Sequence, residues 1–91
     1  MTATLGGRVE DPGGGVISDA QVLARHTETN IVTAAQTDRE GRFRFSYLRV
    51  GPYEVIVKAA GFADARLSVT LTVGSAYELP VALSIGPERE T

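Results

Sequence analysis

The chain of 91 residues contains no cysteine, no tryptophan and only one histidine, His26. Without cysteine it has neither a disulfide framework nor a thiolate nucleophile. A zinc site needs three or four ligands, and a serine nucleophile needs a histidine beside it, so one histidine supports neither. We therefore expect no catalytic residue, no metal and no cofactor, and we interpret His26 as a solvated residue at a hairpin tip.

The sequence also lacks long apolar runs and a surplus of positive charge. No run approaches the roughly 20 residues of a membrane helix, and no basic segment followed by an apolar core marks a signal peptide. The formal net charge of -2 offers no electrostatic basis for binding nucleic acid or an anionic membrane. We expect no nucleic acid partner and no direct membrane insertion.

What remains is enough apolar material for one folded domain. Hydrophobic residues make up 43% and charged residues 22% of the chain, which is typical of a globular protein. Apolar and polar residues alternate with a period of two, which predicts strands rather than helices. The expected strands cover residues 4–10, 20–25, 31–37, 43–45, 53–59, 66–72 and 77–85. Seven short strands between glycine- and proline-rich turns predict an all-β sandwich.

Shared parity within the strands predicts which side chains form the core. The inward set is Phe43, Phe45, Leu48, Tyr53, Val55, Val57, Leu67, Val69, Leu79 and Val81, and Tyr77 has the same parity as Leu79. Pro80 cannot donate to a β-ladder, so we expect the last strand to lie at a sheet edge.

The segment from Thr37 to Tyr53 carries the most information. Asp38 and Gly41 fit the first and last positions of a four-residue turn, with Asp38 capping it. A glycine is expected at a positive φ there and again at Gly51. In the strand that follows, two phenylalanines point to one face and Arg42 and Arg44 to the other.

These residues form the pattern Thr-Asp-x-x-Gly-x-Phe-x-Phe-x-x-Leu-x-x-Gly-x-Tyr, which resembles the signature of carboxypeptidase regulatory-like domains. The signature positions are Thr37, Asp38, Gly41, Phe43, Phe45, Leu48, Gly51 and Tyr53, followed by Gly61 and Phe62. The resemblance extends over about residues 5 to 85. It implies a seven-stranded Greek-key β-sandwich of the transthyretin (prealbumin) kind, with carbohydrate-binding-like relatives. We expect residues 1–91 to form a single domain, with 86–91 as a linker stub.

The family resemblance also implies a setting. Such domains occur beside metallocarboxypeptidases, in surface adhesins and N-terminal to TonB-dependent outer-membrane receptors. The chain is then expected to be an excised, non-catalytic accessory module of a larger extracytoplasmic protein, in the periplasm, outer membrane or cell surface. Its expected partners are neighbouring domains of the same polypeptide or another surface protein. A strand of such a partner would add to the first strand or to the strand from Tyr77 to Ile85.

Two further interpretations remain open at the level of sequence. A glycan would need an exposed aromatic ring for stacking, and Tyr47 is the one ring we expect to be exposed. Arg42 and Arg44 would either hold an acidic partner or form a solvated face that pairs with Glu54.

Overall fold

The computed structural model describes residues 2–85, and all regular structure in them is β. Alternating apolar residues and six turn-rich breaks between the strands leave no segment with a helical period, which is why no helix forms in these residues. The strands are β1 Thr2–Glu10, β2 Gln21–His26, β3 Val32–Gln36, β4 Arg42–Arg49, β5 Gly51–Lys58, β6 Ala65–Leu71 and β7 Ala76–Ala82. The predicted all-β class is confirmed. Residues 86–91, expected to be a linker, lie outside the described residues.

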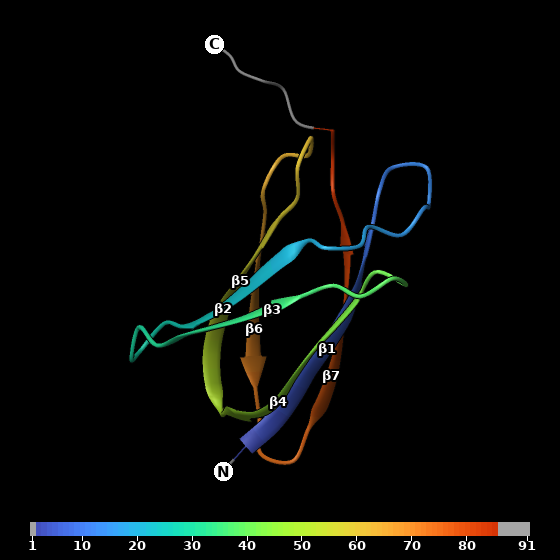
Figure 1. Cartoon of the computed structure of the whole chain (residues 1–91). Coiled ribbons are helices and arrows are strands. Elements are labelled where there is room, and N and C mark those ends of the chain that lie inside the picture. Colours follow the sequence, from blue (N-terminus) through green and yellow to red (C-terminus); the bar gives the residue numbers. More distant parts are fainter. Residues whose placement is uncertain (1, 86–91) are drawn as a thin grey trace.

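The strands form two layers that face each other as a sandwich (Figure 1). One sheet has the order β4-β1-β7 and the other the order β3-β2-β5-β6. Hairpins join β2 to β3 and β5 to β6, whereas the other connections cross between sheets, in the Greek-key manner. Strand β1 pairs antiparallel with β4 and parallel with β7. The expectation that the first strand lies at an edge is therefore wrong, and the expectation that the last strand does is confirmed.

The core lies between the sheets and follows the predicted parity. Nine of the ten predicted core side chains are buried, and Leu67 is half-buried but packs against them. Leu5, Val9, Val22 and Ala24 complete the core from β1 and β2. Alternation places every second residue of a strand on one face, so these positions meet between the two layers.

Strand β4 differs from its prediction. We expected a short strand at residues 43–45, but it continues to Arg49. The continuation is irregular, since Ala3 pairs with Leu48 whereas Leu5 pairs with Phe45. One residue of β1 thus faces two of β4, which is a β-bulge. The broken alternation after Phe45 concealed this part of the strand.

The turn before β4 is confirmed. The Gly41 amide donates to the Asp38 carbonyl at 3.0 Å, and Gly41 has φ +76°. A Cβ atom at Gly41 would come within 2.8 Å of the Val9 carbonyl oxygen and 2.9 Å of the Val16 Cβ. Glycine is required there both by the backbone angle and by the close approach of β1.

Candidate binding groove

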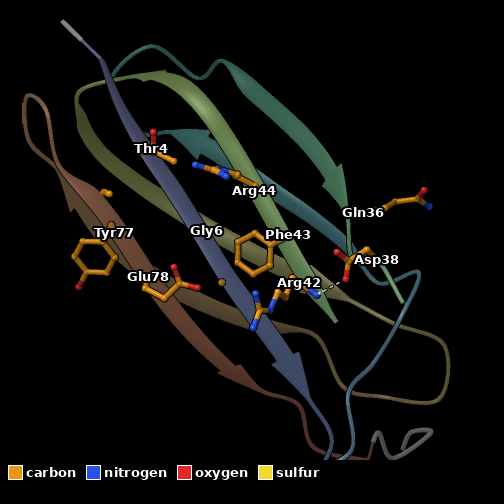
Figure 2. Close-up of a pocket in the computed structure, with 11 residues that line it drawn as sticks. Thr4, Gly6, Gln36, Asp38, Arg42, Phe43, Arg44, Tyr77 and Glu78 are labelled. Carbon is orange, nitrogen blue, oxygen red and sulfur yellow. Dashed lines mark hydrogen bonds between the residues drawn. The ribbon is translucent and has the colours of Figure 1, made fainter. Parts of the chain in front are cut away.

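An open groove of about 560 Å³ crosses the outer face of the β4-β1-β7 sheet (Figure 2). Its floor lies at Gly6 of the central strand, which pairs with Arg44 on one side and Glu78 on the other. Since glycine has no side chain, the sheet surface is lower there than at the flanking positions. The groove is consequently walled by a cation on β4 and an anion on β7.

The cationic wall is unpaired. Arg42 and Arg44 both line the groove, and within residues 2–85 neither guanidinium has a carboxylate partner within 4.0 Å. Arg8 stands directly opposite Arg42 on β1 and is balanced by Glu10 at 3.1 Å. Like charges placed opposite each other in a ladder are unfavourable. An anionic group bound between them would relieve that repulsion.

The expected pairing of these arginines with Glu54 is wrong. Glu54 lies on β5 in the other sheet, where it contacts Arg25 at 2.9 Å and Arg66 at 3.5 Å. The hydrogen bond from Arg25, followed by the positive charge of both arginines, lowers the pKa of Glu54. Sequence parity placed Glu54 on an outward face correctly, but it cannot tell which sheet a strand joins.

Asp38 also lines the groove, but its carboxylate is already engaged. Its Oδ1 accepts hydrogen bonds from the amides of Glu40 at 2.9 Å and Arg42 at 3.0 Å. These bonds, of which the one from Arg42 contributes most, lower the pKa of Asp38. The role of Asp38 is therefore to cap the turn, as predicted, and its charge offsets part of the field of Arg42.

Tyr77 is not in the core, which contradicts our expectation. It has inward parity opposite Leu5, yet it is 43% exposed and lines the groove. Because β7 is an edge strand, its first inward residue has no neighbouring strand to cover it. The proline at position 80 already indicated an edge, so this exposure was accessible from the sequence.

The second feature is Tyr47, at one end of the sandwich. Its side chain is 84% exposed, as expected, and its φ is +60°. A bulky residue seldom adopts that angle, and here it belongs to the bulge of β4, which turns the ring outward. Beside it lies a hollow of about 130 Å³ whose lining includes Ile31 and Arg49.

His26 closes the inner side of that hollow and is not solvated, so the interpretation as a turn residue is wrong. It is 4% exposed, because it continues the inward row of Val22 and Ala24 on β2. Its Nε2 lies 3.0 Å from the Val50 carbonyl. Since a carbonyl only accepts, Nε2 carries the proton. The ring also packs edge-on against Tyr53, at 4.9 Å between ring centres.

Tyr53 has a structural role in this end of the sandwich. Its hydroxyl donates to the Arg49 carbonyl at 2.7 Å, and burial raises its pKa. Within residues 2–85 there is no group of three or more histidine, cysteine or acidic side chains placed to hold a metal ion. In the same residues no helix of the length and apolarity needed to cross a membrane is present.

A family model described as carboxypeptidase regulatory-like domain matches residues 4–84 of this chain. No curated protein matches the sequence significantly.

Solved structures share the fold at low identity. The Bacillus anthracis TIE protein aligns with a TM-score of 0.79 and 16% identity, over 92% of this chain and 16% of that protein. BcpA, the major pilin subunit of Bacillus cereus, aligns with a TM-score of 0.78 and 11% identity, over 94% of this chain and 31% of BcpA. A putative carbohydrate binding protein from Pseudomonas aeruginosa aligns with a TM-score of 0.71 and 13% identity, over 89% of this chain and 88% of that protein. This chain thus spans only 16% of the TIE protein and 31% of BcpA.

Proposed function

The chain belongs to the carboxypeptidase regulatory-like domain family, and from that premise we propose that it is a non-catalytic accessory module that docks a partner protein. The partner is a neighbouring domain of the same polypeptide or another surface protein. The setting we propose is a larger bacterial cell-surface or outer-membrane protein, of the kind in which such a domain precedes a TonB-dependent receptor. The likeness to BcpA, the major pilin subunit of Bacillus cereus, supports an extracytoplasmic setting.

The observation that carries the docking proposal is that Arg42 and Arg44 lie side by side next to the groove floor at Gly6, and that neither has a carboxylate partner within residues 2–85. Residues two apart on a strand lie on one face at about 6.6–7 Å. An extended partner segment with acidic residues at alternate positions has the same spacing. Guanidinium groups bind carboxylates through charge-assisted and often bidentate hydrogen bonds. The proposed ligand of the groove is therefore an extended stretch of protein whose acidic residues contact Arg42 and Arg44 on the β4 wall, away from Glu78 on β7.

Affinity measurements with charge variants test this proposal. A labelled peptide with alternating glutamates is titrated with the chain, and binding is followed by fluorescence anisotropy. The double variant Arg42→Gln, Arg44→Gln is expected to weaken binding at least about tenfold, which is the loss of two charge-assisted contacts. Arg66→Gln is the matched control, because Arg66 is equally on a strand but contacts Glu54. Equal losses in the two variants would contradict a specific groove.

A glycan remains a second candidate, because Tyr47 presents an almost fully exposed ring beside a hollow. One stacked ring is worth about 1 kcal/mol, so the expected affinity is near the millimolar range. Micromolar binding of any oligosaccharide that is lost in Tyr47→Ala would favour this candidate over protein docking.

A further inference from the structure

The sandwich has four edge strands, and most of them are closed to a further strand. Directly after β7, the Leu83 amide donates to the Glu10 carbonyl of β1. Because backbone groups alternate in direction along a strand, the N–H and C=O groups of the odd-numbered residues of β7 point to β1, and those of the even-numbered residues point to the open edge. Pro80 is therefore on the open side, where it removes the N–H group that an incoming strand would use. The edge that the sequence favoured for docking is thus obstructed.

Edge β4 is obstructed in another way. The outward amide and carbonyl of Arg42 are both taken by Asp38, through its side chain at 3.0 Å and its backbone amide at 2.9 Å. The bulge at Tyr47 ends regular pairing at the other side. On β6, Arg66 is a charged, exposed residue, the second of the strand. Charged side chains, prolines and bulges are the devices by which proteins protect sheet edges.

Strand β3 has none of these devices. Its sequence Val-Thr-Ala-Ala-Gln contains no charge and no proline, and it pairs with β2 in an unbroken register. The His26 amide donates to the Ile31 carbonyl, and the Thr37 amide donates to the Ala20 carbonyl. The backbone N–H and C=O groups of the odd-numbered residues of β3 therefore point to β2.

The even-numbered residues consequently present their backbone groups to the open edge. These are Val32, Ala34 and Gln36, spaced symmetrically about Ala34. Their side chains are all exposed on the outer face of the sheet. Three unprotected N–H and C=O pairs in a regular array form a template for another strand.

The side chains beside this edge indicate what kind of strand it accepts. Ala34 pairs with Leu23 of β2, and Leu23 pairs with Ile56 of β5. These three residues form an apolar stripe across the outer face that runs directly to the edge at Ala34. A fitting strand must continue this stripe with a small apolar residue and must bring no charge to either side of it.

We propose that β3 pairs antiparallel with β3 of a second copy of this chain, about a two-fold axis at Ala34. In that register Ala34 faces its counterpart, and Val32 faces Gln36 of the other copy. All three outward backbone pairs of each copy are then satisfied, and no charged residue of β3 opposes another. The stripes of Ile56, Leu23 and Ala34 join into one stripe across an eight-stranded sheet. This inference does not depend on the partner proposed for the groove.

The contact involves only five residues per copy, so its area is far below that of a permanent dimer. We expect a dissociation constant on the order of 0.1–1 mM for the isolated chain, as for small transient interfaces. Anchoring many copies on one surface would raise their effective concentration and favour the pairing.

Sedimentation equilibrium of the 91-residue chain, up to about 1 mM, is the first test. We expect a reversible monomer–dimer equilibrium, and a monomer over the whole range would overturn the proposal. Ala34→Lys and Ala34→Glu should each abolish the dimer, since like charges then meet at the axis. An equimolar mixture of the two should restore it. Failure of the mixture to associate more strongly than either variant alone would overturn the register.

A covalent trap provides a second test that does not depend on weak affinity. Opposed residues in a hydrogen-bonded antiparallel pair have Cα atoms about 5.5 Å apart, within disulfide range. Since the chain has no cysteine of its own, Ala34→Cys reports only on this contact. Ala82→Cys, on an outward position of edge β7, is the matched control. Oxidation should crosslink Ala34→Cys at least about tenfold faster, and equal rates would contradict pairing through β3.

Discussion

The imidazole of His26 occupies the space directly over the Cα atom of Gly51. A Cβ atom at position 51 would overlap Nε2 and come within 3.1 Å of Cε1, and Gly51 has φ +132°. The same ring is held by the Val50 carbonyl and by Tyr53. The glycine and the tyrosine of the family signature therefore serve to seat a buried histidine, and the hollow beside Tyr47 is built on that arrangement.

We predict that Gly51→Ala destabilises the fold by about 2–3 kcal/mol, from steric overlap with His26 together with backbone strain. Urea unfolding monitored by circular dichroism measures this loss. Gly74→Ala is the control, because its φ is +74° but no atom lies within 4 Å of its Cβ position. It should cost roughly 1 kcal/mol, the strain alone. A larger loss in Gly74→Ala than in Gly51→Ala would contradict the steric argument.

Phe45→Ala is expected to destabilise the chain by about 3–5 kcal/mol, because its side chain is buried between the sheets. For a domain of this size that loss can remove most of the folding free energy. Thermal unfolding compares it with Ser46→Ala, the exposed neighbour. A melting temperature of Phe45→Ala close to that of the control would show that the inward assignment is wrong.

Tyr47→Asn should leave stability unchanged or raise it by up to about 1 kcal/mol. Asparagine tolerates a positive φ better than tyrosine, and the exposed tyrosine ring loses little packing when removed. Urea unfolding again gives the result. If Tyr47→Asn were clearly destabilising, the ring would be contributing to the fold, and its exposure would carry no implication for binding.

Acid should destabilise the chain through Glu54. Its folded-state pKa is lowered below the ordinary 4.5, so its stabilising contribution is present above that value and is lost as the pH falls through the folded-state pKa. Asp38, whose pKa is also lowered, adds to the same loss. Melting temperatures from about pH 7 to about pH 2.5 should fall less steeply in Glu54→Gln. Identical slopes for the two chains would contradict this linkage.

The local parts of this structure follow from the sequence, and the sheet assignments do not. Parity within a strand predicted Phe43, Phe45, Val55 and Val57 correctly, because side-chain direction depends only on the strand itself. The burial of Tyr77 was predicted wrongly because parity alone does not show that β7 is an edge strand, although Pro80 indicated it. The predictions for the partner of Glu54 and for the position of β1 in its sheet were wrong because both depend on pairing between distant segments.

The burial of His26 was accessible from the sequence, because it continues the parity of Val22 and Ala24. The position of His26 next to the turn at residues 27–30 favours a solvated side chain, but the parity of the strand decides its burial. The floor at Gly6 was not accessible, since it becomes a groove only when β4 and β7 lie on either side of it.

We propose that the groove between Arg44 and Glu78 receives an acidic segment of a partner protein. Backbone amide chemical shifts of the ¹⁵N-labelled chain, followed during titration with the alternating-glutamate peptide, test this binding residue by residue. We expect saturable shifts at Gly6, Arg42, Arg44 and Glu78 that weaken with added salt. Shifts confined to Ile31 and Tyr47, or no saturable shift at the groove, would contradict it.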